Sequence, residues 1–218
     1  MPYEGQLPAA CIVTARKVGV PRDEVPLVAT LLARVSGQYA VAPGHARIVV
    51  EQAALPSGVP DILVIHASAS ALRRLERSEL RLRTPHEAAT LARLFNGDEL
   101  TRQNRTQLRR LEEAGWLATT AGPANVSEAI AYEVKVRDWQ AGINQLTRYM
   151  KFTSRGALAL PTEAAKRIPR RFLQTNGIGL MTIDEDQVTQ VRKGRSRPLS
   201  VAAQLWLAEL AVRALSDR

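Results

Sequence analysis

Residues 129–161 constrain the fold more than any other part of the chain. Their first letters, AIAYEVKVR, alternate apolar and polar side chains, which predicts a β-strand with Glu133 and Lys135 on one face. The spacing then becomes that of a helix capped by Asp138, with Gln145 beside its apolar stripe. The letters GALALP that follow predict a second, buried strand. A strand, a helix and a strand in succession indicate a right-handed crossover between parallel strands.

The segments upstream of this crossover predict a helix followed by a hairpin. Apolar residues at helical spacing run over residues 23–37 and stop at a glycine. Residues 46–53 are rich in β-branched side chains, and the turn LPSGVP separates them from the apolar run PDILVIHA. This hairpin has Glu51 on its first strand and Asp61 at the start of its second.

The two ends of the chain differ in character. Residues 1–22 carry three prolines and little periodicity, which indicates an irregular arm. Residues 162–173 predict a basic helix, and residues 177–183 and 188–192 predict two paired strands. Residues 199–215 predict a final helix whose apolar side is wide enough to cover a sheet face or a second copy of the chain.

The composition narrows the classes of function. The 218 residues include 30 basic and 21 acidic side chains, a net charge of +9, which favours DNA or another polyanion as partner. No apolar run approaches the length of a membrane span, and we expect a cytoplasmic protein with no membrane partner. A single cysteine and three scattered histidines exclude a zinc-site spacing, so any bound metal needs oxygen ligands.

Polar residues at the predicted strand ends form a set suited to phosphodiester cleavage: Glu51, Asp61, Glu133, Lys135 and Gln145. A hard divalent cation binds carboxylate oxygens, polarises a phosphate and lowers the pKa of an attacking water. A nearby lysine orients that water or stabilises the negative charge that develops on the phosphate oxygens.

The motifs PDILVI, YEVKV and GALALP, in this order, resemble those of the PD-(D/E)xK (restriction endonuclease-like) nuclease superfamily. The resemblance covers roughly residues 23–66 and 129–184, and it implies an α/β fold with a mixed central sheet flanked by helices. It implies that Mg²⁺ or Mn²⁺ is bound by Asp61, Glu133 and the backbone carbonyl of Val134. It also implies that Lys135 orients the attacking water.

Two further roles follow from the same resemblance. Gln145 matches a glutamine on the helix that follows the ExK motif, and Glu51 or Glu24 matches an acidic residue that often precedes the hairpin. Each residue also has a structural alternative. Asp61 begins a strand after a turn, Gln145 lies on a helix surface, and Glu51 pairs with an arginine. Glu133 and Lys135 form an exposed ion pair in the corresponding alternative.

The long segment between Asp61 and Glu133 departs from the family pattern and must carry its own fold. A capping box at Thr84 and Glu87 starts one helix, and an arginine-rich helix and the letters EAGWL follow, which resembles a winged helix-turn-helix. The alternative is a helical insertion used for packing or dimerisation. The residues that the resemblance assigns to DNA contact are Arg102, Gln103, Asn104, Arg105, Thr106, Arg109 and Arg110.

The sequence therefore predicts a nuclease-like domain formed by residues 1–67 and 126–218, with a winged-helix-like insertion at residues 68–125. The function expected is a metal-dependent DNA endonuclease, with a homodimer expected because two sites are needed to cut both strands of a duplex at one position. The alternatives are a catalytically inactive DNA-binding regulator or accessory subunit, and a component that binds an acidic protein partner.

Overall fold

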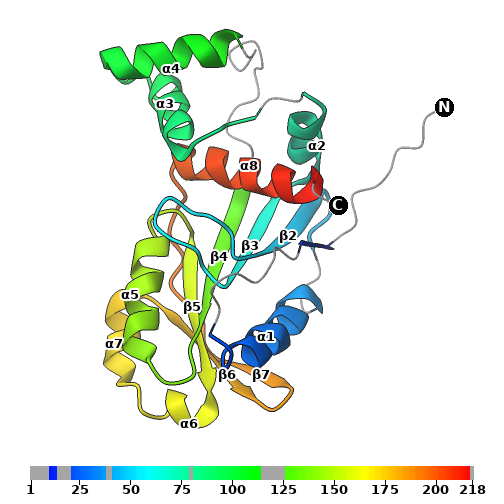
Figure 1. Ribbon diagram of the computed structural model, residues 1–218, viewed down its shortest axis with the longest axis vertical. Coiled ribbons are helices and arrows are strands. Elements are labelled where there is room, and N and C mark those ends of the chain that lie inside the picture. The colour runs from blue at the N-terminus through cyan, green and yellow to red at the C-terminus, as the bar shows by residue number, and fades with distance from the viewer. Residues whose placement is uncertain (1–9, 14–20, 38–40, 79–80, 114–125, 217–218) are drawn as a thin grey trace, which may run out of the picture.

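A computed structural model describes residues 10–13, 21–37, 41–78, 81–113 and 126–216. Within them, seven strands form one sheet in chain order, and its neighbouring strands are both parallel and antiparallel. The strands are β1 Ala10–Val13, β2 His45–Glu51, β3 Ile62–Ser68, β4 Val126–Val134, β5 Arg155–Pro161, β6 Gly179–Asp184 and β7 Gln187–Arg192. The prediction of a mixed central sheet flanked by helices is confirmed (Figure 1).

The described helices lie on both faces of this sheet and beyond one of its ends (Figure 1). They are α1 Val25–Gly37, α2 Ala69–Arg77, α3 Pro85–Phe95, α4 Arg102–Glu113, α5 Trp139–Tyr149, α6 Thr162–Ala165, α7 Arg170–Asn176 and α8 Val201–Ser216. None of these helices combines the length and the hydropathy that a bilayer-spanning segment needs.

The crossover from β4 through α5 to β5 forms as predicted. The Asp138 side chain accepts a hydrogen bond from the Ala141 backbone N–H at 2.9 Å and caps α5. Ile143 and Leu146 of α5 are buried, and β4 and β5 are parallel. The first strand ends at Val134, three residues earlier than the alternation predicts. The crossover thus delivers Glu133 and Lys135 to the strand's carboxyl end, where α5 begins.

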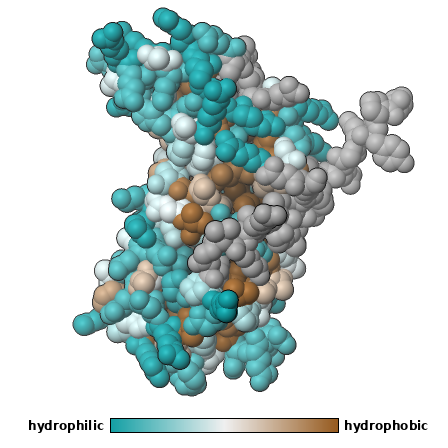
Figure 2. Space-filling view, viewed as in Figure 1, coloured by the Kyte–Doolittle hydropathy of each residue, from teal (hydrophilic) through white to brown (hydrophobic). Residues whose placement is uncertain are grey.

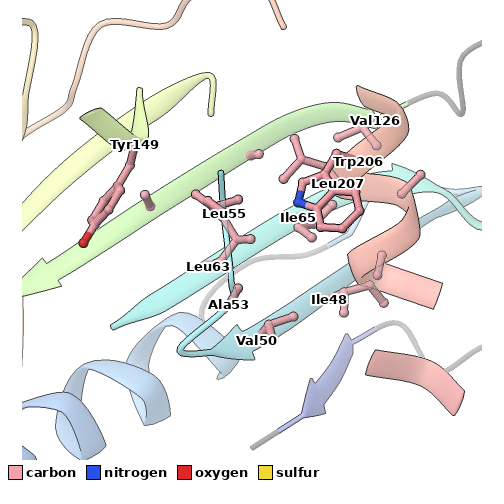
Figure 3. Close-up of a cluster of buried hydrophobic side chains, with 14 of the residues drawn as sticks. Ile48, Val50, Ala53, Leu55, Leu63, Ile65, Val126, Tyr149, Trp206 and Leu207 are labelled. Atoms are coloured by element: carbon pink, nitrogen blue, oxygen red, sulfur yellow. The ribbon is translucent and has the colours of Figure 1, made fainter. Parts of the chain in front are cut away.

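Alternation along the strands divides the core into two layers. Leu63 and Ile65 belong to the layer that α5 and α8 cover, whereas Ile62 and Val64 belong to the layer that α1 covers. Figure 3 shows Trp206 of α8 beside Ile65 in the first layer. Each central strand is therefore apolar on both faces, and any charge on it needs a specific partner.

The insertion between β3 and β4 contributes α2, α3 and α4 at the end of the sheet that these strands share. Helix α3 packs on α8, and α4 packs on α3, so this helical pair extends the molecule away from the sheet (Figure 1). The predicted capping box of α3 is present, with Glu87 and Thr84 bonded to each other's backbone N–H groups. The predicted wing falls on residues 114–125, which lie outside the described residues.

The structure corrects two predictions about the ends of the chain and decides between the two coverings expected for the last helix. The N-terminal arm contains a strand, β1, which pairs in parallel with β2. The predicted basic helix is two short helices, because Pro169 lacks the N–H that would continue α6 and instead precedes α7. The apolar side of α8 packs on the sheet and on α3 of its own chain, so this helix gives no support to the predicted homodimer.

Asn104→Ala is expected to lower the free energy of unfolding by about 1–3 kcal/mol, because Asn104 is buried and its amide joins α3 to α4. Its Nδ2 donates to Thr90 at 3.1 Å, and its Oδ1 accepts from Thr101 at 2.7 Å and Arg93 at 3.2 Å. Urea unfolding followed by circular dichroism measures the change. Arg105→Ala, at an exposed position of the same helix, is the control, and an equal loss in both variants would contradict the structural role of Asn104.

Candidate active site

Antiparallel pairing of β3 and β4 brings Asp61 and Glu133 to the same place. Ile62 and Tyr132 lie opposite each other, and the two acidic residues occupy the next position on each strand. The backbone N–H of Val134 donates to Asp61 Oδ2 at 2.7 Å, which holds this carboxylate against the end of β4. Both acidic residues are buried, at 8% and 2% exposure. The two motif carboxylates, distant in the sequence, are therefore cross-strand neighbours.

Lys135 connects Glu133 to a third carboxylate. Its Nζ lies 2.9 Å from Glu133 Oε1 and 3.3 Å from Glu24 Oε2. Glu24 directly precedes α1 and is itself buried, so the lysine joins the α1 side of the molecule to the end of β4. One ammonium group therefore compensates two carboxylates in a site with little solvent contact.

Burial dominates the electrostatics of this cluster. It raises the pKa of Glu133 to about 7, and the negative charge of Asp61 adds to the effect. Burial also raises the pKa of Asp61 and of Glu24, against the lowering effects of the Val134 N–H and of Lys135 respectively. For Lys135 burial lowers the pKa, but its bond to Glu133 and the surrounding carboxylates outweigh this and raise it. The lysine stays charged while Glu133 titrates near neutral pH.

Helix α5 lies directly against this cluster because of a glycine. A Cβ atom on Gly142 would be 2.6 Å from Leu158 Cδ1 and 3.1 Å from Lys135 Cγ. At such distances the side chains of Leu158 and Lys135 would have to move to admit a Cβ atom. Because Gly142 has no side chain, α5 packs close to the aliphatic part of Lys135 and restricts its position.

Gln145 lies next to Tyr149, a residue of the site that was not among the predicted ones. Gln145 lies one turn before Tyr149 on α5, and its amide has a small lowering effect on the pKa of the tyrosine hydroxyl. The Tyr149 hydroxyl donates to the Val59 carbonyl at 3.0 Å, and burial, Glu133 and Asp61 raise its pKa. Tyr149 therefore holds the loop that leads into Asp61. The i, i+4 spacing of Gln145 and Tyr149 was the available sequence signal.

The sheet register places Glu51 and Asp61 on different faces. Glu51 lies opposite Ile62 at the end of β2 and is buried on the face that α1 covers, whereas alternation puts Asp61 on the other face. The carboxylate that the structure brings to Lys135 is that of Glu24, the other acidic residue considered for this position. The order of residues along the chain did not distinguish these two glutamates.

The donor set suits a small, hard cation. In the described part of the chain, no three His, Cys, Asp or Glu side chains are grouped so as to hold a metal ion by themselves. Mg²⁺, however, is commonly bound by one or two carboxylates and keeps several water ligands. Oε2 of Glu133 is buried and accepts no hydrogen bond from any described residue, which leaves an oxygen available to a cation. The residues present therefore fit such an ion.

The predicted DNA-contact residues of α4 divide into two sets. Asn104 is buried between α3 and α4, and Arg110 forms an ion pair with Glu87 of the capping box. A buried amide does not reach a base edge, so the structure assigns Asn104 to packing within the insertion. The exposed members are Arg102, Gln103, Arg105, Thr106 and Arg109. Figure 2 shows that the surface of this helical pair is predominantly hydrophilic.

The exposed face of α4 and the carboxylate cluster lie at opposite ends of the sheet. Asp61 precedes the first residue of β3, and the insertion follows the last. β3 has 7 residues, which at about 3.3 Å per residue separates the cluster from the base of the insertion by roughly 20 Å.

Glu133→Gln is expected to gain stability relative to the unmodified protein as the pH rises. The folded state raises the pKa of Glu133 to about 7 from 4.5, so the stabilisation that its protonation provides is complete below pH 4.5 and is lost as the pH rises through 7. Glutamine does not titrate. Between about pH 5 and about pH 8.5, the unfolding free energy of the variant minus that of the unmodified protein should therefore rise by about 1–3 kcal/mol. Glu163→Gln, at an exposed position, is the control, and parallel stability curves for Glu133→Gln and the unmodified protein would contradict the shifted pKa.

Comparisons with known proteins identify no relative of established function. No family model and no curated protein matches the chain. Among solved structures, the chain is similar to the SPO1766 protein of unknown function from Silicibacter pomeroyi, with 15% sequence identity and a TM-score of 0.43. That match covers 85% of this chain and 84% of the other. Neither the identity nor the TM-score at this level carries information about activity.

Proposed function

We propose that this protein is a metal-dependent DNA endonuclease of the PD-(D/E)xK type. The observation that supports the proposal most directly is the meeting of Asp61, Glu133 and Lys135 at the adjoining ends of β3 and β4. Carboxylates buried side by side are costly unless a cation or a proton compensates them, which is typical of sites that handle metals or protons. The order of strands around α5 is the one expected for this class of nuclease.

Asp61, Glu133 and the carbonyl of Val134 would hold the metal ion. When bound, Mg²⁺ or Mn²⁺ supplies Lewis-acid polarisation of a phosphodiester and a water of lowered pKa. The N–H of Val134 keeps Asp61 in one orientation at 2.7 Å, so little reorganisation of this carboxylate is needed on binding. Since the pKa of Glu133 is about 7, this residue offers a full negative charge only above neutral pH in the absence of a cation.

Lys135 is suited to stabilise the negative charge that would develop during the reaction. Its raised pKa keeps the ammonium charged, and its short bond to Glu133 fixes it next to the carboxylates. From there it can donate a hydrogen bond to the attacking water or to a phosphate oxygen. Glu24 restrains the same ammonium from the other side, and Gly142 limits the movement of its stem.

The exposed face of α4 would bind duplex DNA away from the point of cleavage. Arg102, Arg105 and Arg109 are exposed along one helix and contact phosphates or base edges in this proposal. A duplex that touches both α4 and the carboxylate cluster must run farther than the roughly 20 Å between the cluster and the base of the insertion, which is more than about six base pairs at about 3.4 Å each. The insertion would therefore bind the duplex at a distance from the carboxylate cluster.

One observation favours a second candidate, a catalytically inactive DNA-binding regulator on the same scaffold. Lys135 already pairs with Glu133 and Glu24, so a single internal ammonium group partly compensates the buried charges. This candidate expects DNA binding that is sensitive to salt and indifferent to chelators, without cleavage.

Asp61→Asn and Lys135→Met are each expected to reduce Mg²⁺-dependent cleavage of duplex DNA by about a hundredfold or more, because each removes a group that acts on the metal or the reacting phosphate. Gel analysis of plasmid nicking, with unfolding curves to verify the fold, measures the effect. Glu163→Gln removes an exposed carboxylate elsewhere and should cleave normally. Cleavage that survives both site changes would refute this assignment, and binding without cleavage in the unmodified protein would favour the regulator.

Changing Arg102, Arg105 and Arg109 together to glutamine is expected to weaken binding to a duplex and to reduce the slope of log K against log salt concentration by about 2–3, because three phosphate contacts are lost. Fluorescence anisotropy in Ca²⁺, at several salt concentrations, provides the measurement. Arg34→Gln, at an exposed position of α1, is the control and should leave the slope nearly unchanged. An unchanged slope in the triple variant would mean that α4 does not contact DNA.

A further inference from the structure

A hollow lies on the α1 face of the sheet, opposite the side that carries Asp61 and Glu133. Its volume is about 290 Å³, close to the lower end of the range for small-molecule sites. Four strand residues of the α1 layer line it and give it an apolar floor: Ile130, Tyr132, Ala157 and Met181. Because Tyr132 and Glu133 are consecutive on β4, the hollow and the carboxylate cluster lie on opposite faces of one strand.

The rim of this hollow is cationic. Arg155, Arg192 and Lys193 line it, and Glu128, the one carboxylate among the described lining residues, pairs with Arg155 Nη1 at 2.9 Å. Burial lowers the pKa of His66, so this ring is neutral at physiological pH. Arg192 and Lys193 therefore leave the hollow with a net positive charge.

Two of these side chains have buried donors without an acceptor. The Nε atoms of Arg155 and Arg192 are inaccessible to solvent, and among the described residues neither donates a hydrogen bond. A buried guanidinium N–H without an acceptor is unfavourable, and a planar guanidinium matches the oxygens of a phosphate. Both side chains are half-buried, so rotation of their guanidinium groups can present these donors to a phosphate in the hollow.

Backbone contacts hold the wall that carries Lys193. A Cβ atom on Gly194 would be 2.8 Å from the Gly156 carbonyl oxygen and 3.0 Å from the Gly179 nitrogen, so only glycine allows this close approach. Further along, the Arg197 N–H donates to the Ser154 carbonyl at 2.9 Å. The loop after β7 is therefore fixed against the sheet, and the cationic rim is largely formed before any ligand arrives.

We propose that this hollow binds a nucleoside phosphate, with the phosphate against Arg155, Arg192 and Lys193 and the base on the apolar floor. A phosphate alone needs the cationic rim, whereas a ligand with a ring also uses the floor. The site is separate from the proposed catalytic cluster and does not depend on nuclease activity.

Isothermal titration of the full chain with adenosine 5′-monophosphate tests the proposal. We expect saturable binding with a Kd of about 10 µM to 1 mM, and weaker binding of inorganic phosphate, which lacks the ring. Arg192→Gln should weaken binding about tenfold because one charge-assisted contact is lost. Arg167→Gln removes an equal charge from an exposed position outside the hollow and should bind normally. No saturation up to about 5 mM, or an equal loss in both variants, overturns the proposal.

Two further binding measurements identify which phosphate ligand is bound and at which site. Asp61→Asn should bind the nucleotide normally, because Asp61 lies on the other face; a loss there with normal binding in Arg192→Gln would overturn the assignment. A short duplex oligonucleotide that loses affinity in Arg192→Gln, while the nucleotide binds neither protein, would assign the rim to a nucleic-acid backbone and overturn the nucleotide site. Normal nucleotide binding with no DNA cleavage would refute the proposed nuclease and leave this site intact.

Discussion

The compensation of buried negative charge at the ends of β3 and β4 is the constraint on which the candidate site depends. Asp61 and Glu133 lie between two apolar layers, where ionised carboxylates are costly. The Val134 N–H stabilises the first, and Lys135 stabilises the second. The remaining cost appears in the pKa of Glu133, which burial and Asp61 raise to about 7. A bound cation or proton would relieve this cost of burying ionised carboxylates.

The architecture separates this charge cluster from the rest of the proposed machinery. The insertion leaves and rejoins the sheet at the far ends of β3 and β4, so its length does not disturb the pairing that aligns Asp61 with Glu133. Long insertions at such positions carry a small entropic cost because loop closure depends weakly on length. The cationic hollow occupies a third position, on the face away from α5. Substrate positioning, chemistry and ligand binding would thus use the insertion, one end of the sheet and one of its faces, respectively.

The local patterns were predictable where a short stretch contained all the determinants. Alternation followed by a helical period defined β4 and α5, and Asp138 marked the start of that helix. The capping box at Thr84 was equally predictable from the sequence. The prediction for residues 162–173 was wrong because the helical pattern was extended across Pro169, a residue without a backbone N–H to donate. Asn104 was predicted at a DNA-contact surface because a sequence pattern does not tell which side of α4 packs on α3.

The crossover, the hairpin, and the positions of the motif carboxylates and the lysine follow from the sequence, because alternation, capping and turn chemistry act between residues a few positions apart. Which carboxylates meet depends on how distant segments pack. The approach of Glu24 to Lys135, the hydrogen bond from Tyr149 to the loop before Asp61, and the cationic hollow of β3–β7 all depend on strand register and on which face each helix covers. Those relations join residues far apart in the chain, and no local pattern records them.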